Sequence, residues 1–304
     1  MSRSKRIWRL AFSLAVGAFF VASAVAKWVD VRDFELYVFS FGFLGFDLVS
    51  LAARLLIILE LGTGLWFLSG WKARGAKVLA VAELTVFSAF LLWRMAAGDH
   101  ASCHCFGSLA DLAPGQSLLK NLLVLAVVLL SAPEGFRLPF AHVGLPVLTV
   151  LAGVALFATR PPDFWYRLGG RVSSDLDPVR LETLCRERAL DGPRLVCFFS
   201  TGCGFCRDCA VKLDGILSRE GIDPDRVRLF FLELNDTTAR EAAAFVGELM
   251  KGKAYPCEVL PADVFLPATN GSMPLVAVCR DGVLVQEYDL LTLDEGIGAA
   301  FSAE

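Results

Sequence analysis

Two cysteines separated by two residues, Cys203 and Cys206, stand where a short apolar run meets a helical pattern. The run 195–199 is typical of a buried strand, and 207–219 is typical of a helix. Unpaired N–H groups and the dipole at a helix N-terminus favour a thiolate on the first cysteine, so a C-x-x-C pair at this junction indicates a redox dithiol. We therefore predict Cys203 as the nucleophile and Cys206 as the resolving thiol of a disulfide exchange.

A metal site is the main alternative for these cysteines. Cys209 extends the pattern to C-x2-C-x2-C, the opening of a ferredoxin-type run, but no fourth cysteine follows at the required spacing. Cys209 fits either a third exchange thiol or a packed side chain, and Cys257 fits a partner for Cys209 or for a substrate. The other three cysteines of this half lie in or beside apolar stretches and are predicted to be small buried side chains: Cys185, Cys197 and Cys279.

The stretch after Cys206 predicts the order β-α-β-α-β-β-α around the dithiol. Its elements are strand 227–234, helix 237–250 with cap candidates at 235–237, a hairpin of strands 275–279 and 283–288, and a last helix 291–300. This order, with Met273-Pro274 directly before the third strand, resembles the thioredoxin fold over residues 177–304. The resemblance implies a cis Pro274 that lines the catalytic site. A Pro-rich loop insertion, 255–267, departs from it.

The first half of the chain has the composition of a membrane domain. The 304 residues are 55% hydrophobic, and most of the excess lies before about residue 160. A helix needs about 20 apolar residues to cross the hydrocarbon core. Five apolar segments meet or approach this length: 7–26, 48–68, 76–96, 117–132 and 140–158. The net charge of −3 gives no case for a nucleic-acid partner.

The distribution of basic residues predicts the orientation. Lysine and arginine gather before the first segment, between the second and third, and at Arg137, whereas the loop 98–116 has none. The positive-inside rule then places the N-terminus in the cytoplasm and, after five crossings, the C-terminal half outside it. We expect a bacterial plasma (inner) membrane protein with a periplasmic domain. Cleavage of residues 3–26 as a secretory signal is the alternative for the first segment.

A second thiol pair, Cys103-His104-Cys105, lies in the predicted outer loop. Two thiols one residue apart form a strained ring when oxidised, and strain makes a disulfide labile, as a redox relay requires. Copper is the rival, because thiolates with imidazole suit Cu(I). A membrane quinone near Cys103 and Cys105 is the predicted electron acceptor.

Four ionisable residues in or beside the first three segments are functional candidates. They are Lys27, Asp30, Glu60 and Glu83. For the two glutamates the alternatives are a proton path and a hydrogen bond between protonated carboxyls that only packs helices. Lys27, Arg54 and Arg94 are expected near the outer surface, where long basic side chains snorkel.

The motifs of this half resemble the MauE branch of the DoxX-like membrane proteins, named for methylamine utilisation. The matching residues, over 7–132, are Lys27-x-x-Asp30, Glu60-Leu61-x-x-Gly64, Cys103-x-Cys105-Phe106-Gly107 and Lys120-Asn121-Leu122. That family has four helices, so the fifth is read as an added crossing. The resemblance implies a redox-associated membrane partner of periplasmic thiol proteins.

The sequence thus predicts an α-helical transmembrane bundle of four plus one helices (1–159), a linker (160–176) and an α/β thioredoxin-like domain (177–304). The expected function is disulfide exchange with periplasmic thiol or disulfide client proteins through Cys203 and Cys206, with Cys103 and Cys105 as relay. A metal-handling or cofactor-maturation chaperone that uses the same cysteines as ligands is the alternative. Membrane lipid is the other expected partner.

Overall fold

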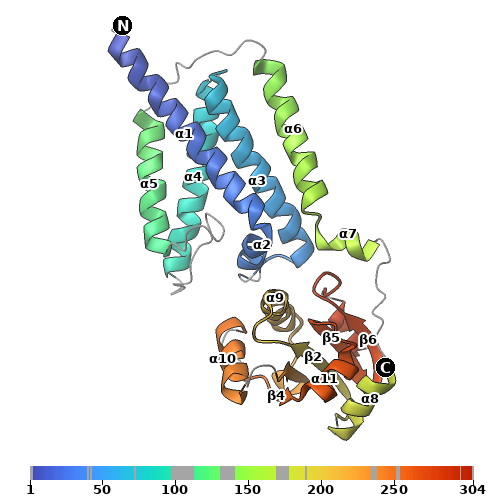
Figure 1. The fold of residues 1–304 in the computed structure, drawn as a ribbon. Helices are drawn as coiled ribbons and strands as arrows, with labels where there is room; N and C mark the ends of the chain where they lie inside the picture. The colour runs from blue at the N-terminus through green and yellow to red at the C-terminus, as the bar shows by residue number, and fades with distance from the viewer. Residues whose placement is uncertain are drawn as a thin grey trace. The chain divides into compact units, whose positions relative to one another are not determined.

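The computed structural model describes residues 3–39, 41, 43–71, 73–96, 113–130, 141–168, 178–188, 190–233, 238–250, 254–294 and 296–302. Two compact units divide the chain (Figure 1): Met1–Val38 with Ser50–Pro161, and Phe39–Val49 with Pro162–Glu304. Cys103 and Cys105 lie outside the described residues, and with them the predicted relay and the Cys-His-Cys copper alternative.

Helices make up the described N-terminal part of the chain. They are α1 (Arg3–Val29), α2 (Val31–Phe39), α3 (Phe46–Ser69), α4 (Ala73–Ala96), α5 (Pro114–Leu130) and α6 (Ala141–Thr159). Four of them, α1, α3, α4 and α6, are long and apolar enough to cross a membrane, and α5 is a shorter apolar helix. Each of the five predicted segments is therefore helical over the residues that the structure describes. The short helix α2 was not predicted, because its mixed sequence of nine residues has no long apolar run.

Two glycines bring the backbones of α1 and α3 together. A Cβ built on Gly64 would lie 2.8 Å from Cγ2 of Val21 and 2.9 Å from the backbone oxygen of Gly17. A Cβ on Gly17 would in turn lie 3.0 Å from the backbone oxygen of Gly64. Small residues at a helix crossing permit such an approach in a membrane. Gly64, one turn from Glu60, therefore positions α3 against α1.

Replacing Gly64 by alanine should lower the free energy of unfolding by about 1–3 kcal/mol, because the added methyl group overpacks the crossing. Gly144→Ala in α6 is the matched control, since no atom lies within 4 Å of the Cβ it would add. Denaturation of the full-length protein in detergent measures both variants. Equal stability of the two variants would contradict the close approach.

The C-terminal part mixes helices with one sheet (Figure 1). Its elements are α7 (Asp163–Leu168), α8 (Pro178–Glu187), β2 (Pro193–Phe199), α9 (Gly204–Glu220), β3 (Val227–Leu232), α10 (Ala239–Leu249), β4 (Cys257–Leu260), α11 (Ala262–Thr269), β5 (Leu275–Arg280), β6 (Val283–Tyr288) and α12 (Ile297–Ser302), with a short 3₁₀ helix at Pro224–Arg226. Helix α7 falls inside the stretch predicted as a linker, 160–176.

The five strands form one sheet in the order β4-β3-β2-β5-β6. Strands β2, β3 and β4 run parallel, whereas β5 is antiparallel to β2 and to β6. The central strand β2 is buried on both faces. Phe198 joins a cluster formed with α8 and α11, and Phe199 contacts Phe245 of α10, with ring centroids 6.1 Å apart. The unbroken apolar run that predicted this strand therefore reflects burial on two sides.

The structure corrects the region predicted as a loop insertion, 255–267. Cys257 begins β4, which pairs with β3 in parallel register opposite Leu229, and α11 follows at once. Pro261 stands directly before this helix, where a backbone N–H would have no intrahelical hydrogen-bond partner, so proline loses no hydrogen bond there. The four-residue strand has too little periodicity of its own, and only its partner strand defines it. The element order is therefore β-α-β-α-β-α-β-β-α.

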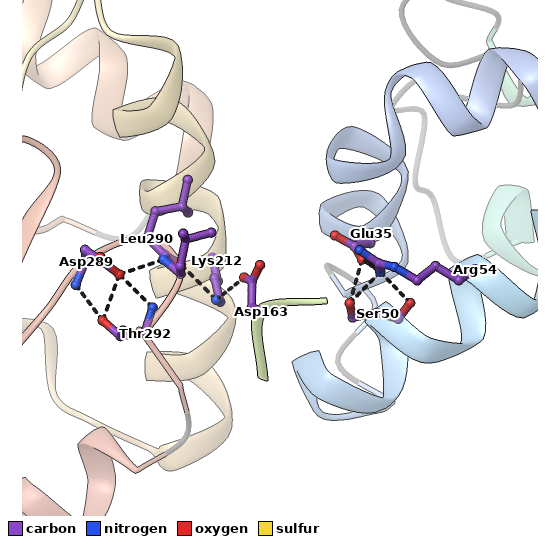
Figure 2. A network of polar contacts seen from close by, with 9 residues as sticks. Glu35, Ser50, Arg54, Asp163, Lys212, Asp289, Leu290 and Thr292 are labelled. Atoms are coloured by element: carbon purple, nitrogen blue, oxygen red, sulfur yellow. Dashed lines mark hydrogen bonds and ion pairs between the residues drawn. The ribbon is translucent and has the colours of Figure 1, made fainter. Parts of the chain in front are cut away.

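Two helix starts also differ from the prediction. Helix α10 is capped by Thr238, in a capping box with Glu241, so the candidates at 235–237 were wrong. The last helix begins at Ile297 and not at residue 291. The side chain of Asp289 accepts hydrogen bonds from the N–H groups of Leu291 and Thr292, and these bonds form a local turn in place of a helix (Figure 2).

Candidate functional site

Cys203 lies at the junction of β2 and α9, as the sequence predicts. It is the N-cap residue of α9, with φ −94° and ψ 118°, and its Sγ accepts a hydrogen bond from the backbone N–H of Cys206 at 3.3 Å. The thiol is half-buried. The helix N-terminus therefore directs a backbone donor and the positive end of its dipole at this sulfur.

Cys206 lies inside the same helix turn and is fully buried. Its Sγ is 3.4 Å from the backbone nitrogen of Ser200, which donates to it. Burial, together with a hydrogen bond to Cys203, raises the pKa of the Cys206 thiol far above its ordinary value. Phe205, between the two cysteines, is 68% exposed. One accessible and one buried thiol thus stand on a single helix turn, beside an exposed aromatic ring.

The Met273-Pro274 peptide bond is cis, as predicted. Pro274 directly precedes β5, whose Leu275 lies opposite Phe198 of β2. Because β2 ends at Phe199, the register places Pro274 at the same end of the sheet as the dithiol. The structure therefore brings Pro274 and the dithiol to one end of the sheet.

The remaining cysteines near the dithiol have different surroundings. Cys209 is fully buried in α9, which supports packing over a third exchange thiol. Cys257 is half-buried on the edge strand β4. Among the described residues, no three histidine, cysteine or acidic side chains come together as a metal-binding group. Cys203, Cys206 and Cys209 are therefore not grouped as metal ligands in the described part of the chain.

Alkylation should distinguish the two thiols of the reduced dithiol. Iodoacetamide should modify Cys203 first, because it is the accessible thiol of the pair, whereas Cys206 is fully buried. Cys206 should stay unmodified up to about pH 9, since its raised pKa and its burial keep it protonated and covered. Mass spectrometry after timed quenching measures both sites, and Cys257, also half-buried, serves as the internal comparison. Modification of Cys206 ahead of Cys203 would contradict the assignment.

A second polar site lies among the membrane helices, around Lys27 of α1. Nζ of Lys27 is 2.7 Å from both carboxylate oxygens of Glu60 on α3 and 2.9 Å from Oγ of Ser23. The Lys27 side chain is only 4% exposed. The structure thus joins two of the predicted candidates in a buried ion pair, and the expectation that Lys27 snorkels to the surface is wrong.

Glu83 lies beside this pair on α4. Thr63 donates to one of its oxygens at 2.7 Å, whereas Oε2 of Glu83 and Nδ2 of Asn121 are buried without a hydrogen-bond partner in the described part of the chain. Both line a cavity of about 30 Å³ together with Lys27, Glu60 and Lys120. A polar cavity of this size can hold one water molecule. Glu60 bonds to Lys27 and Glu83 bonds to Thr63, so a hydrogen bond between the two carboxyls does not hold α3 against α4. The proton path through these residues stays a prediction.

Asp30 is not brought to this cavity. It lies in the turn between α1 and α2, where its backbone carbonyl accepts a hydrogen bond from the N–H of Phe34. The Lys-x-x-Asp spacing therefore contributes only its lysine to the polar site.

The other two basic residues expected at the surface are also buried. Arg54 of α3 donates to Glu35 and to Oγ of Ser50 (Figure 2). It also donates to the backbone oxygen of Arg160 at 2.8 Å. Arg94 of α4 donates to the hydroxyl of Tyr37 and is 1% exposed. Both partners, Glu35 and Tyr37, come from α2. Because sequence reasoning did not find this helix, it also missed these interactions.

A further buried cation, Lys212 on α9, was not predicted from the sequence. Its Nζ donates to Asp163 of α7 at 2.8 Å and to the backbone oxygen of Leu290 at 3.0 Å (Figure 2). Lysine at one buried position of an otherwise mixed helix gives no signal in the sequence. The ion pair fastens α7 to the helix that carries the dithiol.

An apolar groove of about 470 Å³ lies between α3, α4 and α6. Three of the polar side chains along it form hydrogen bonds within the protein: Thr63 donates to Glu83, Thr149 to the backbone of Leu145, and the Trp66 ring to the backbone of Trp71. The groove is lined mainly by apolar side chains, and we assign no quinone to it.

Comparison with known proteins bears on the N-terminal part. The family described as "Methylamine utilisation protein MauE" matches residues 5–134. No curated protein and no solved structure matches the chain. The matched stretch holds α1 to α5 with Lys27, Glu60 and Glu83, and it ends before α6 and the dithiol. This chain is therefore a membrane protein whose residues 5–134 are MauE-like.

Proposed function

We propose that this protein is a membrane-anchored thiol-disulfide oxidoreductase whose C-terminal unit has a thioredoxin-like fold. One observation supports this most directly. Cys203 caps α9 with its sulfur facing the N–H of Cys206, and Cys206 is the buried thiol of the same turn. The parallel pair β2 and β3, the antiparallel hairpin β5 and β6 and the cis Pro274 agree with such a fold.

The reaction follows from the two environments. The Cys203 thiolate attacks one sulfur of a client disulfide, a mixed disulfide forms, and the other client sulfur leaves as a thiolate. Cys206 then attacks Sγ of Cys203, which releases the second client sulfur and leaves a Cys203–Cys206 disulfide. The reverse sequence oxidises a client dithiol. The exposed Phe205 ring and the backbone beside Pro274 would bind an extended client segment.

The client proteins are proposed to be extracytoplasmic, on the distribution of basic residues along the chain. In the proposed direction, electrons pass from a client to Cys203 and Cys206, then to Cys103 and Cys105, and then to a membrane oxidant such as a quinone. This relay rests on the sequence, because Cys103 and Cys105 lie outside the described residues. The groove between α3, α4 and α6 adds nothing to it.

Trapping of clients tests the proposal. Cys206→Ser should accumulate mixed disulfides between Cys203 and client proteins in cells, seen as reducible high-mass bands. The double variant Cys203→Ser with Cys206→Ser should show none, and Cys257→Ser with Cys206→Ser should still show them. A membrane-impermeant maleimide added to intact cells should label Cys203. If no adduct depends on Cys203, the proposed activity is wrong.

A further inference from the structure

A second pair of cysteines meets inside the C-terminal unit. Sγ of Cys185 on α8 and Sγ of Cys279 on β5 are 3.3 Å apart, although 94 residues separate them in the sequence. Both side chains are fully buried in the cluster that α8 and α11 form with the sheet. Sequence reasoning predicted their burial but not their contact. Core packing alone does not explain why two thiols from distant elements should be in direct contact.

This pair is separate from the dithiol at Cys203. Cys279 lies opposite Arg194, near the start of β2, whereas Cys203 follows the end of β2. The five residue steps along the strand from Arg194 to Phe199 correspond to about 16 Å. Cys279 also faces α8 and α11, whereas the Phe199 side chain faces α10. Cys185 and Cys279 therefore cannot resolve a mixed disulfide on Cys203.

We propose that Cys185 and Cys279 form a second, structural disulfide that fastens α8 to the sheet. A bonded pair of sulfurs is about 2.05 Å apart, so from the 3.3 Å contact each sulfur has to move by only about 0.6 Å. Disulfides persist in oxidising compartments, which is where the distribution of basic residues places this unit. The proposal does not depend on the activity proposed for Cys203.

The oxidation balances with a small-molecule disulfide such as oxidised glutathione, R–S–S–R. One thiol of the pair loses a proton, attacks R–S–S–R and releases one R–S⁻. The other thiol then attacks the mixed disulfide and releases the second R–S⁻, so two R–SH form for each new S–S bond. Because both thiols are buried, the exchange takes place before α8 packs during folding.

Helix α8 has other attachments to the sheet, and these keep the test interpretable. Glu182 accepts a hydrogen bond from the N–H of Leu284, and Arg188 pairs with Glu258 at 2.7 Å. A variant without the disulfide should therefore still fold, with lower stability. The disulfide would add stability mainly by restricting the unfolded chain across the 94-residue separation.

The test is peptide mapping of the full-length protein, purified from membranes in detergent with free thiols blocked at lysis. We expect a peptide pair joined through Cys185 and Cys279 that disappears on reduction. We also expect reductant to lower the unfolding midpoint of a Cys203→Ser, Cys206→Ser background by about 5–10 °C. The same background with Cys185→Ala and Cys279→Ala should show no such shift, whereas adding Cys197→Ala should leave the shift intact. Recovery of both cysteines as blocked thiols, after refolding with oxidised glutathione as well, would overturn the proposal.

Discussion

Cys203→Ser should reduce disulfide exchange to the uncatalysed rate, because a hydroxyl cannot replace the thiolate as nucleophile. Serine is itself a preferred N-cap residue, so the start of α9 should be preserved. We expect the free energy of unfolding to change by no more than about 0.5 kcal/mol. The loss would then be chemical and not structural.

The rate of reduction of a fluorescent peptide disulfide by the full-length protein, with dithiothreitol as the electron source, measures this effect. Cys257→Ser is the matched control, because Cys257 is also half-buried but lies on the edge strand β4. That variant should retain full activity. Cys209→Ala should also retain it, since Cys209 is buried one turn further along α9. Activity that survives Cys203→Ser would assign the nucleophile to another thiol.

Lys27→Met should destabilise the membrane helices by about 3–5 kcal/mol, because it leaves the Glu60 carboxylate buried without its partner. Glu60→Leu should do the same by leaving the Lys27 ammonium buried without its carboxylate partner. The double variant Lys27→Met with Glu60→Leu should recover much of the loss, since apolar side chains of similar volume can replace a buried ion pair. This recovery distinguishes a pairing effect from a packing defect.

Unfolding of the full-length protein in mixed micelles measures the double-mutant cycle. Arg74→Gln at the start of α4 is the control, because that side chain is exposed, and its effect should stay within about 0.5 kcal/mol. Losses that simply add in the double variant would show that Lys27 and Glu60 act independently. The same variants also test the polar cavity, because Glu83 and Asn121 line it together with both residues.

Local patterns were sufficient to predict the elements that carry the chemistry. Five apolar segments each predicted a helix, because long runs of apolar residues are stable in lipid only when their backbone bonds are internal. The apolar run before Cys203 predicted β2, and the two-residue spacing placed both cysteines on the first turn of α9. Each of these features depends on residues adjacent in the sequence. The cis Met273-Pro274 bond was instead expected from the resemblance to the thioredoxin fold.

Contacts between distant residues were decided only by the tertiary structure. Whether Lys27 reaches the surface or pairs with Glu60 depends on the approach of α1 to α3, which Gly17 and Gly64 permit. The partner of Arg54 comes from α2, a helix too short to be recognised from its composition. The residue type alone does not show whether such a basic side chain reaches the membrane surface or forms a buried ion pair.

In the C-terminal unit, the β4–α11 segment and the Cys185–Cys279 contact likewise could not be predicted from local sequence patterns. Four residues of strand become β4 only because β3 offers an open edge in parallel register. Two cysteines 94 residues apart meet only because α8 packs over β5. The sequence by itself therefore determined which segments are helix or strand and where the dithiol lies. The packing of those segments decided which charges and thiols are paired, because pairing depends on distances that no local pattern encodes.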